Sequence, residues 1–307
     1  METFRTRLLE FLFPPERDSW LVILRVGLGL EVTLYSLSLR NDWAYLLSGT
    51  ARQLAEGLLS LDSHFVPRLG WLVALGAHVA LHEETVLSVA WICFLASGFG
   101  LLMGLASRFS AVLAWFLHLC AAKSGGFVSY GVDNFMTIAL FYLMLSPLPD
   151  RYSLDWSLRE LRPKNPQLLG FWRRVLQLHL CVIYFFSGLT KCLGSGWWNG
   201  SSVWRALIRP PFNVIDPEIL VRWKYLFPIA GIFICLVEIG YPFFIWNRKT
   251  RKIWLICICG MHLGIGVMMG MYLFALIMIV LNVAAFGPGL FRTGRERMSL
   301  QPQEALS

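Results

Sequence analysis

Charged residues are scarce in this chain. Asp, Glu, Lys and Arg make up 15% of its 307 residues, and 56% of the residues are hydrophobic. In a soluble globular domain about a quarter of the residues are charged. We therefore exclude that class and expect a polytopic membrane protein in contact with the lipid bilayer. The formal net charge of +8 does not indicate a nucleic-acid partner, because the Lys and Arg residues cluster between apolar runs, as in cytoplasmic loops.

The sequence also lacks the patterns of a disulfide framework, a removable signal peptide and a zinc-protease motif. The seven cysteines lie in apolar runs or at their ends, so they are interpreted as packing residues and not as a disulfide framework. No short apolar region followed by a small-residue cleavage site opens the chain, so no removable signal peptide is expected. In HVALHEE, His78 and His82 are four positions apart, but no Glu directly follows the first His as in the zinc-protease motif, and no metal site is expected.

Apolar stretches recur along the chain at lengths suited to crossing a membrane. They predict an all-α membrane helical bundle of about eight transmembrane helices, with residues 1–290 as one transmembrane domain and 291–307 as a polar cytoplasmic tail. Residues 1–18 are expected to lie on the inner membrane surface, and 40–85 to form an interfacial or re-entrant segment. The predicted spans are 19–39, 86–106, 109–123, 131–147, 171–192, 225–246, 253–269, and a last one from a tight turn near Gly270 to Phe286.

The distribution of Lys and Arg predicts the orientation. With both termini in the cytoplasm, the basic loop 149–174 and the NRKTRK loop lie inside, as the positive-inside rule requires of a protein in the cell inner membrane. Asp133 and Asn134 then begin the fourth span at the outer level, where Lys191 ends the fifth. This shared depth predicts that the three residues converge.

Ionisable residues inside the predicted spans are candidates for function. Arg25 and Glu31 in the first span are six positions apart, so they are expected on different faces, each with a partner on another helix. Glu238 in the sixth span is equally compatible with helix pairing and with a proton path. His179 is interpreted as a packing residue.

Residues 184–200, YFFSGLTKCLGSGWWNG, place one lysine, Lys191, at the end of an apolar aromatic run. In one interpretation its ammonium simply reaches the headgroup region, as lysines at helix ends commonly do. In the other it is a catalytic base, because an amine in an apolar site loses the solvation that its charge requires.

Four stretches in order, including YFFSGLTK, resemble the membrane domain of vitamin K-dependent γ-carboxylase, also called the horizontally transferred transmembrane domain (HTTM). The resemblance implies that Lys191 deprotonates a vitamin K or menaquinone-type hydroquinone, and that Asp133 and Asn134 fall on or next to a polar pair that stabilises the quinone oxygens. His262 falls on a histidine of the seventh helix, and Tyr184, Trp197 and Trp198 are expected in the cofactor pocket. The other three stretches are GVDNFMTIALFYLMLSP (131–147), YSLD (152–155) and MHLGIGVMMGMYLFALIMI (261–279).

The sequence departs from this family at three points. Thr190 precedes Lys191 where the family has a second lysine, and the carboxylate of Asp133 would favour a plain ion pair. The chain ends soon after the eighth predicted span, without the large lumenal portion that binds the carboxylase's substrate, so protein γ-carboxylation by this chain alone is not expected.

Two classes of function therefore stay open. The first is a quinone-linked membrane enzyme, either carboxylase-like or an oxidoreductase, with Lys191 as general base. The second is a non-catalytic membrane partner or maturation factor for a secreted peptide or another membrane protein. A channel or transporter is a third alternative, although the sequence has no clear inverted repeat.

Overall fold

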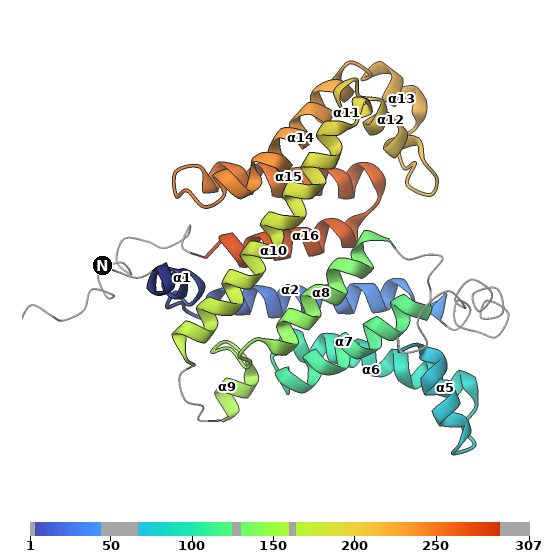
Figure 1. Cartoon of the computed structure of the whole chain (residues 1–307). Helices are drawn as coiled ribbons and strands as arrows, with labels where there is room; N and C mark the ends of the chain where they lie inside the picture. The colour runs from blue at the N-terminus through green and yellow to red at the C-terminus, as the bar shows by residue number, and fades with distance from the viewer. Residues whose placement is uncertain (1–3, 44–66, 125–129, 160–163, 289–307) are drawn as a thin grey trace, which may run out of the picture.

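The computed structural model describes residues 4–43, 67–124, 130–159 and 164–288, which form helices and no strands (Figure 1). The predicted polar tail, 291–307, lies outside these ranges. Five of the described helices are long and apolar enough to cross a membrane, as expected for a multi-pass membrane protein. They are α2 (Ser19–Ser38), α6 (Glu83–Met103), α10 (Pro166–Leu193), α14 (Leu226–Phe244) and α15 (Arg251–Met269).

The other three predicted spans are also helices. These are α7 (Ser107–Ser124), α8 (Gly131–Leu145) and α16 (Tyr272–Phe286). α8 and α16 have only 15 residues each, fewer than the roughly 20 that cross a full hydrocarbon core. The all-α class is therefore confirmed, and the number of membrane crossings stays a prediction.

The long helices form two packed groups. In the first, α6 packs against α2 and α7, and α8 packs against α7 and α2. In the second, α14 packs against α10 and α15, and α16 packs against α15 and α10. The last helix, α16, also contacts α2 and α8, so it joins the two groups (Figure 1). Together they bury one large apolar cluster.

Short helices connect or cover these groups. α11 (Ser195–Trp198), α12 (Ser201–Ile208) and α13 (Pro217–Arg222) follow α10 and gather at one end of the second group (Figure 1). There α11 and α12 pack against α14. α1 (Phe4–Leu12) buries none of its residues, as expected for a surface segment. In the chain, α5 (Leu69–Ala77) precedes α6 and packs against α6 and α7, and α9 (Leu154–Leu158) lies between α8 and α10.

The predicted interfacial segment 40–85 is described only in part, and residues 44–66 lie outside the described ranges. α5 has 9 residues, too few to cross a membrane. His78 follows the end of α5, and His82 precedes α6, so the two imidazoles do not share a helical face. Within the described ranges, no group of three or more His, Cys, Asp or Glu side chains could hold a metal ion.

Helix ends follow the local sequence. Asn165 accepts hydrogen bonds from the first backbone N–H groups of α10, and Pro166 occupies its first turn. Gly270 ends α15 with a φ of 69°, a conformation that glycine adopts without strain. The tight turn predicted near Gly270 is confirmed.

The two ionisable residues of α2 have different surroundings. The guanidinium of Arg25 contacts Asp150, in the loop after α8, at 2.5 Å and also donates to the carbonyl of Leu101 on α6. The expected partner on another helix is therefore the Leu101 carbonyl, whereas the carboxylate partner of Arg25 lies in a loop. Glu31 is completely buried, and among the described residues neither of its carboxyl oxygens has a hydrogen-bond partner. The expectation that Glu31 pairs with another helix is therefore wrong.

Candidate functional site

Lys191 lies in the last turn of α10 and contacts a carboxylate on a neighbouring helix. Its Nζ donates to Oε2 of Glu238 at 2.6 Å and to Oγ of Ser187, one turn earlier, at 2.5 Å. The Lys191 side chain is 21% exposed and that of Glu238 is 7% exposed. The amine is thus held by a charged hydrogen bond inside the protein, and it is not a free ammonium at a helix end.

Close packing of α10 and α14 brings this pair together. A Cβ atom at Gly188 would lie 2.5 Å from the backbone nitrogen of Ile239, so only glycine permits this approach of the two helices. On the α14 side, Pro242 lies one turn after Glu238. Because proline has no N–H, the Glu238 carbonyl loses the helical hydrogen bond that this position would otherwise donate.

Trp197 covers the amine from α11. The Nζ of Lys191 lies 5.4 Å from the centre of the Trp197 ring, within the range of a cation–π contact. A Cβ at Gly231 would meet the carbonyl oxygen of Trp197, so this glycine on α14 lets α11 approach closely. Trp198 has a different position, because it is 46% exposed and its indole N–H donates to the carbonyl of Cys192.

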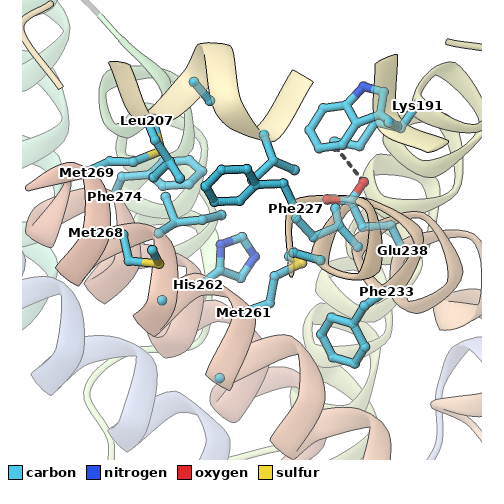
Figure 2. A pocket seen from close by; sticks show the side chains of 18 of the residues that line it. Lys191, Leu207, Phe227, Phe233, Glu238, Met261, His262, Met268, Met269 and Phe274 are labelled. Carbon is cyan, nitrogen blue, oxygen red and sulfur yellow. Dashed lines mark hydrogen bonds and ion pairs between the residues drawn. The ribbon is translucent and has the colours of Figure 1, made fainter. Parts of the chain in front are cut away.

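A cavity of about 730 Å³ opens beside the Lys191–Glu238 pair, within the size range of small-molecule sites. Figure 2 shows the pair at one side of this space, with His262 of α15 projecting into it among methionine and phenylalanine side chains. The polar side chains that line it are Ser187, Lys191, Glu238, Tyr184 and His262, and the rest of the wall is almost entirely apolar or aromatic.

Tyr184 and His262 belong to a buried hydrogen-bonded network. The hydroxyl of Tyr184 lies 2.8 Å from Nε2 of His262. The amide nitrogen of Asn282 on α16 donates to the same hydroxyl at 2.7 Å, and the hydroxyl of Tyr241 donates to the Asn282 oxygen at 2.7 Å. The network fixes the imidazole from one side, as buried polar groups generally require.

The other imidazole nitrogen is unused. Nδ1 of His262 is buried and has no hydrogen-bond partner within the described ranges, although the residue lines the cavity. An unpaired buried polar atom costs about 1–3 kcal/mol. A ligand with a hydroxyl or carbonyl group would remove that cost, so His262 is suited to orient a polar ligand group.

Asp133 and Asn134 are not beside Lys191. Asp133 accepts a hydrogen bond from Tyr35 at 2.5 Å and from the backbone of Tyr130 at 2.8 Å, and it stabilises the first turn of α8. Asn134 is exposed, and neither residue lines the cavity. The expected convergence of these two residues with Lys191 is thus not found, because Tyr35 and the Tyr130 backbone hold the Asp133 carboxylate and the Asn134 side chain is exposed.

Several features of the site were visible in the sequence and others were missed. The cavity wall brings together four expected residues, Lys191, Tyr184, Trp197 and His262.

The pairing of Lys191 with Glu238 was not inferred, although Glu238 is the single carboxylate of the sixth predicted span. Asn282 was also missed, and one amide in an otherwise apolar helix was the sequence feature that could have identified it. His179 contacts the Tyr142 hydroxyl at 2.7 Å, in keeping with its expected packing role.

The comparisons with known proteins add no relative. No protein-family model, curated protein or solved structure matches the chain. The assignment of a function therefore depends on the geometry of the cavity and on the motif resemblance.

Proposed function

We propose that this protein is a multi-pass membrane enzyme that binds a lipid-soluble hydroquinone in the Lys191 cavity and removes a proton from it. The observation that carries the proposal is one cavity with a partly buried amine–carboxylate pair at one side and an imidazole nitrogen in its wall that is unpaired within the described ranges. A bound hydroquinone would supply an acidic hydroxyl and a ring that can be oxidised.

The cavity fits such a group. Its wall is apolar and aromatic apart from the five polar side chains, which suits a substituted aromatic ring with an apolar tail. The Nδ1 atom of His262 can hydrogen-bond one ring oxygen, and the Lys191–Glu238 pair can meet a second hydroxyl. Phe233 and Met268 line the cavity and are also exposed, which supports an opening toward lipid.

Glu238 changes the role expected of Lys191. A charged ammonium cannot accept a proton, so Lys191 must first pass one to Glu238 across their 2.6 Å contact. The resulting neutral amine and neutral acid carry the same net charge as the ion pair, and an apolar wall reduces the advantage of the charged form. Lys191 then serves as the base and Glu238 as the store of its proton.

The membrane arrangement of the proposal follows the hydropathy and charge of the chain. The eight long helices cross the bilayer, and both termini lie in the cytoplasm of a cell inner membrane. α11, α12 and α13 then cover the cavity on the outer side, and the basic segment around α9 lies inside.

A non-catalytic partner or maturation factor is the second candidate. The same ion pair supports it, because a salt bridge at a helix interface can serve only to hold α10 and α14 together. In that case the cavity would hold lipid or part of a peptide, and no proton would be transferred.

The deciding experiment is mass spectrometry of lipids that co-purify with the protein, followed by quinol-dependent oxygen uptake. We expect a retained quinone, and a loss of uptake of about 10²–10⁴-fold in Lys191→Met. Lys224→Met is the matched control, since Lys224 is exposed and does not line the cavity. Unchanged uptake in a folded Lys191→Met protein would refute the catalytic role and leave the second candidate.

A further inference from the structure

A second buried polar cluster lies in the first group of helices, apart from the Lys191 cavity. Its central residue is Glu31 of α2, which is fully buried, and neither of its carboxyl oxygens has a hydrogen-bond partner in the part of the chain that the structure describes. Arg25 on the same helix is occupied by Asp150, so it does not neutralise Glu31. An isolated carboxylate in an apolar interior costs far more than a neutral carboxyl group, so the Glu31 side chain is expected to carry a proton.

The ionisable groups found near Glu31 are two phenols. Tyr35 lies one turn further along α2, on the same face, and Glu31 is close enough to interact electrostatically with both Tyr35 and Tyr130. α2 also packs against α6 and α16. Their only ionisable side chains are Glu83, Glu84 and Cys93 on α6 and Tyr272 on α16, so neither helix brings a cation to Glu31.

The polar groups continue from Tyr35 toward the end of the bundle where α8 begins. The Tyr35 hydroxyl donates to Oδ1 of Asp133 at 2.5 Å, and Nε2 of His118 lies 3.9 Å from the same oxygen. This Nε2 atom is itself buried and has no hydrogen-bond partner in the described segments, while Nδ1 contacts Thr137 at 3.1 Å. Two unsatisfied groups thus flank a hydrogen-bonded Tyr–Asp pair, an arrangement that can accept and pass on a proton.

We propose that Glu31 is a proton-binding site inside the bundle, and that Tyr35, Asp133 and His118 form the route by which its proton exchanges with the end at which α8 begins. One turn of α2 separates Glu31 from Tyr35, about 6 Å along the helix axis. A water molecule between their side chains would complete the route. The inference does not depend on the hydroquinone proposal, because none of these residues lines that cavity.

Infrared spectroscopy of the full-length protein in lipid tests both parts of the proposal. At neutral pH we expect a C=O band of a protonated carboxylic acid that shifts when the protein is made with ¹³C-labelled glutamate. The band should be absent from Glu31→Gln and retained in Glu238→Gln. The isotope shift identifies a glutamic acid even if Glu31→Gln fails to fold. Absence of such a band, or its survival in a folded Glu31→Gln protein, would overturn the assignment.

Transfer to D₂O tests the route. In the unsubstituted protein the Glu31 band should shift with time as the carboxyl proton exchanges, and Tyr35→Phe should slow this at least about tenfold, the factor that a change of about 1.4 kcal/mol produces. A general loosening of the bundle would speed the exchange, so slowing points to the route itself. Ser36→Ala, the neighbouring buried position, is the control with an unchanged rate. No exchange in the unsubstituted protein, or an equal rate in Tyr35→Phe, would overturn the route.

Discussion

Gly188 of α10 faces the backbone of Ile239 on α14, and a Cβ atom placed there would approach the Ile239 nitrogen to 2.5 Å. The glycine lies one turn before Lys191, and Ile239 directly follows Glu238. The close helix contact and the ion pair are therefore parts of one interface. In membrane bundles such small residues let backbones approach and strengthen van der Waals packing.

Replacing Gly188 by Ala should push α10 and α14 apart. Because the colliding atoms are backbone and cannot rotate away, we expect a loss of about 1–3 kcal/mol of unfolding free energy. The measurement is thermal or denaturant unfolding in detergent. Gly260→Ala is the matched control: a Cβ there meets no atom within 4 Å, and alanine favours the helix by about 0.5–1 kcal/mol. Equal stability of the two variants would contradict the packing argument.

A double-mutant cycle on Lys191 and Glu238 measures their coupling. Lys191→Met or Glu238→Leu alone leaves one charge without its partner. A single break of a buried pair costs about 3–5 kcal/mol, and because Lys191 is 21% exposed we expect a loss below that range. The double variant replaces both charges by apolar side chains and should recover most of that loss. Unfolding of the four proteins gives the coupling energy. Independent effects of the two substitutions would mean that the contact contributes little.

Activity separates the structural role of the pair from its catalytic role. The Lys191→Met/Glu238→Leu protein should be folded but without quinol-dependent turnover, because it lacks both the proposed base and the carboxylate that stores the proton of this base. A purely structural pair predicts the opposite result, with function recovered together with stability.

Filling the cavity should prevent ligand binding without unfolding the protein. Gly264 of α15 lines the cavity, and a Cβ there also meets no atom within 4 Å, so Gly264→Phe would project its ring into open space. We expect co-purified ligand to fall by tenfold or more, while Gly264→Ala retains most of it. Unchanged ligand content in Gly264→Phe, measured by mass spectrometry per mole of protein, would place the ligand elsewhere.

The helices were predictable from the sequence because their apolar stretches and terminators are local. The turn at Gly270 and the start of α10 at Asn165 depend only on glycine, proline and amide chemistry at those positions. Asp150 as the partner of Arg25 was not predictable, because it is 125 positions away in the chain. Which residues meet across helices depends on packing, and hydropathy does not determine it.

The candidate site shows the same limit. Tyr184 and Lys191 were expected together because the motif resemblance contains both, and seven positions on a helix do return to the same face. Shared depth and the resemblance suggested that Asp133 meets Lys191, but two residues at one level can belong to different helix groups. Asp133 instead contacts Tyr35 and lies near His118, and Glu238 occupies the position beside the amine.

Asp155 makes the stability of the α7 start depend on pH. Its carboxyl oxygens accept hydrogen bonds from the backbone nitrogens of Ala106 and Ser107 at 2.8 and 2.6 Å. Burial raises the pKa of Asp155, but these hydrogen bonds and the charge of Arg159 outweigh it and lower the pKa below its ordinary value of 3.8. The carboxylate therefore contributes its full stabilisation above the ordinary pKa, and this is lost as the pH falls through the folded-state pKa.

Asp155→Asn should accordingly destabilise the protein at pH 7 and lose its effect in acid. We expect about 1.5–3 kcal/mol at pH 7, the range of a hydrogen bond to a charged group, and convergence of the two proteins once the pH is below the lowered pKa of Asp155. Unfolding midpoints across this pH range give the comparison. Asp216→Asn is the control, because Asp216 also accepts a backbone hydrogen bond at a helix start and asparagine caps a helix as well as aspartate does. A difference between wild type and Asp155→Asn that stays constant down to the lowest pH would show that shape, and not charge, stabilises this junction.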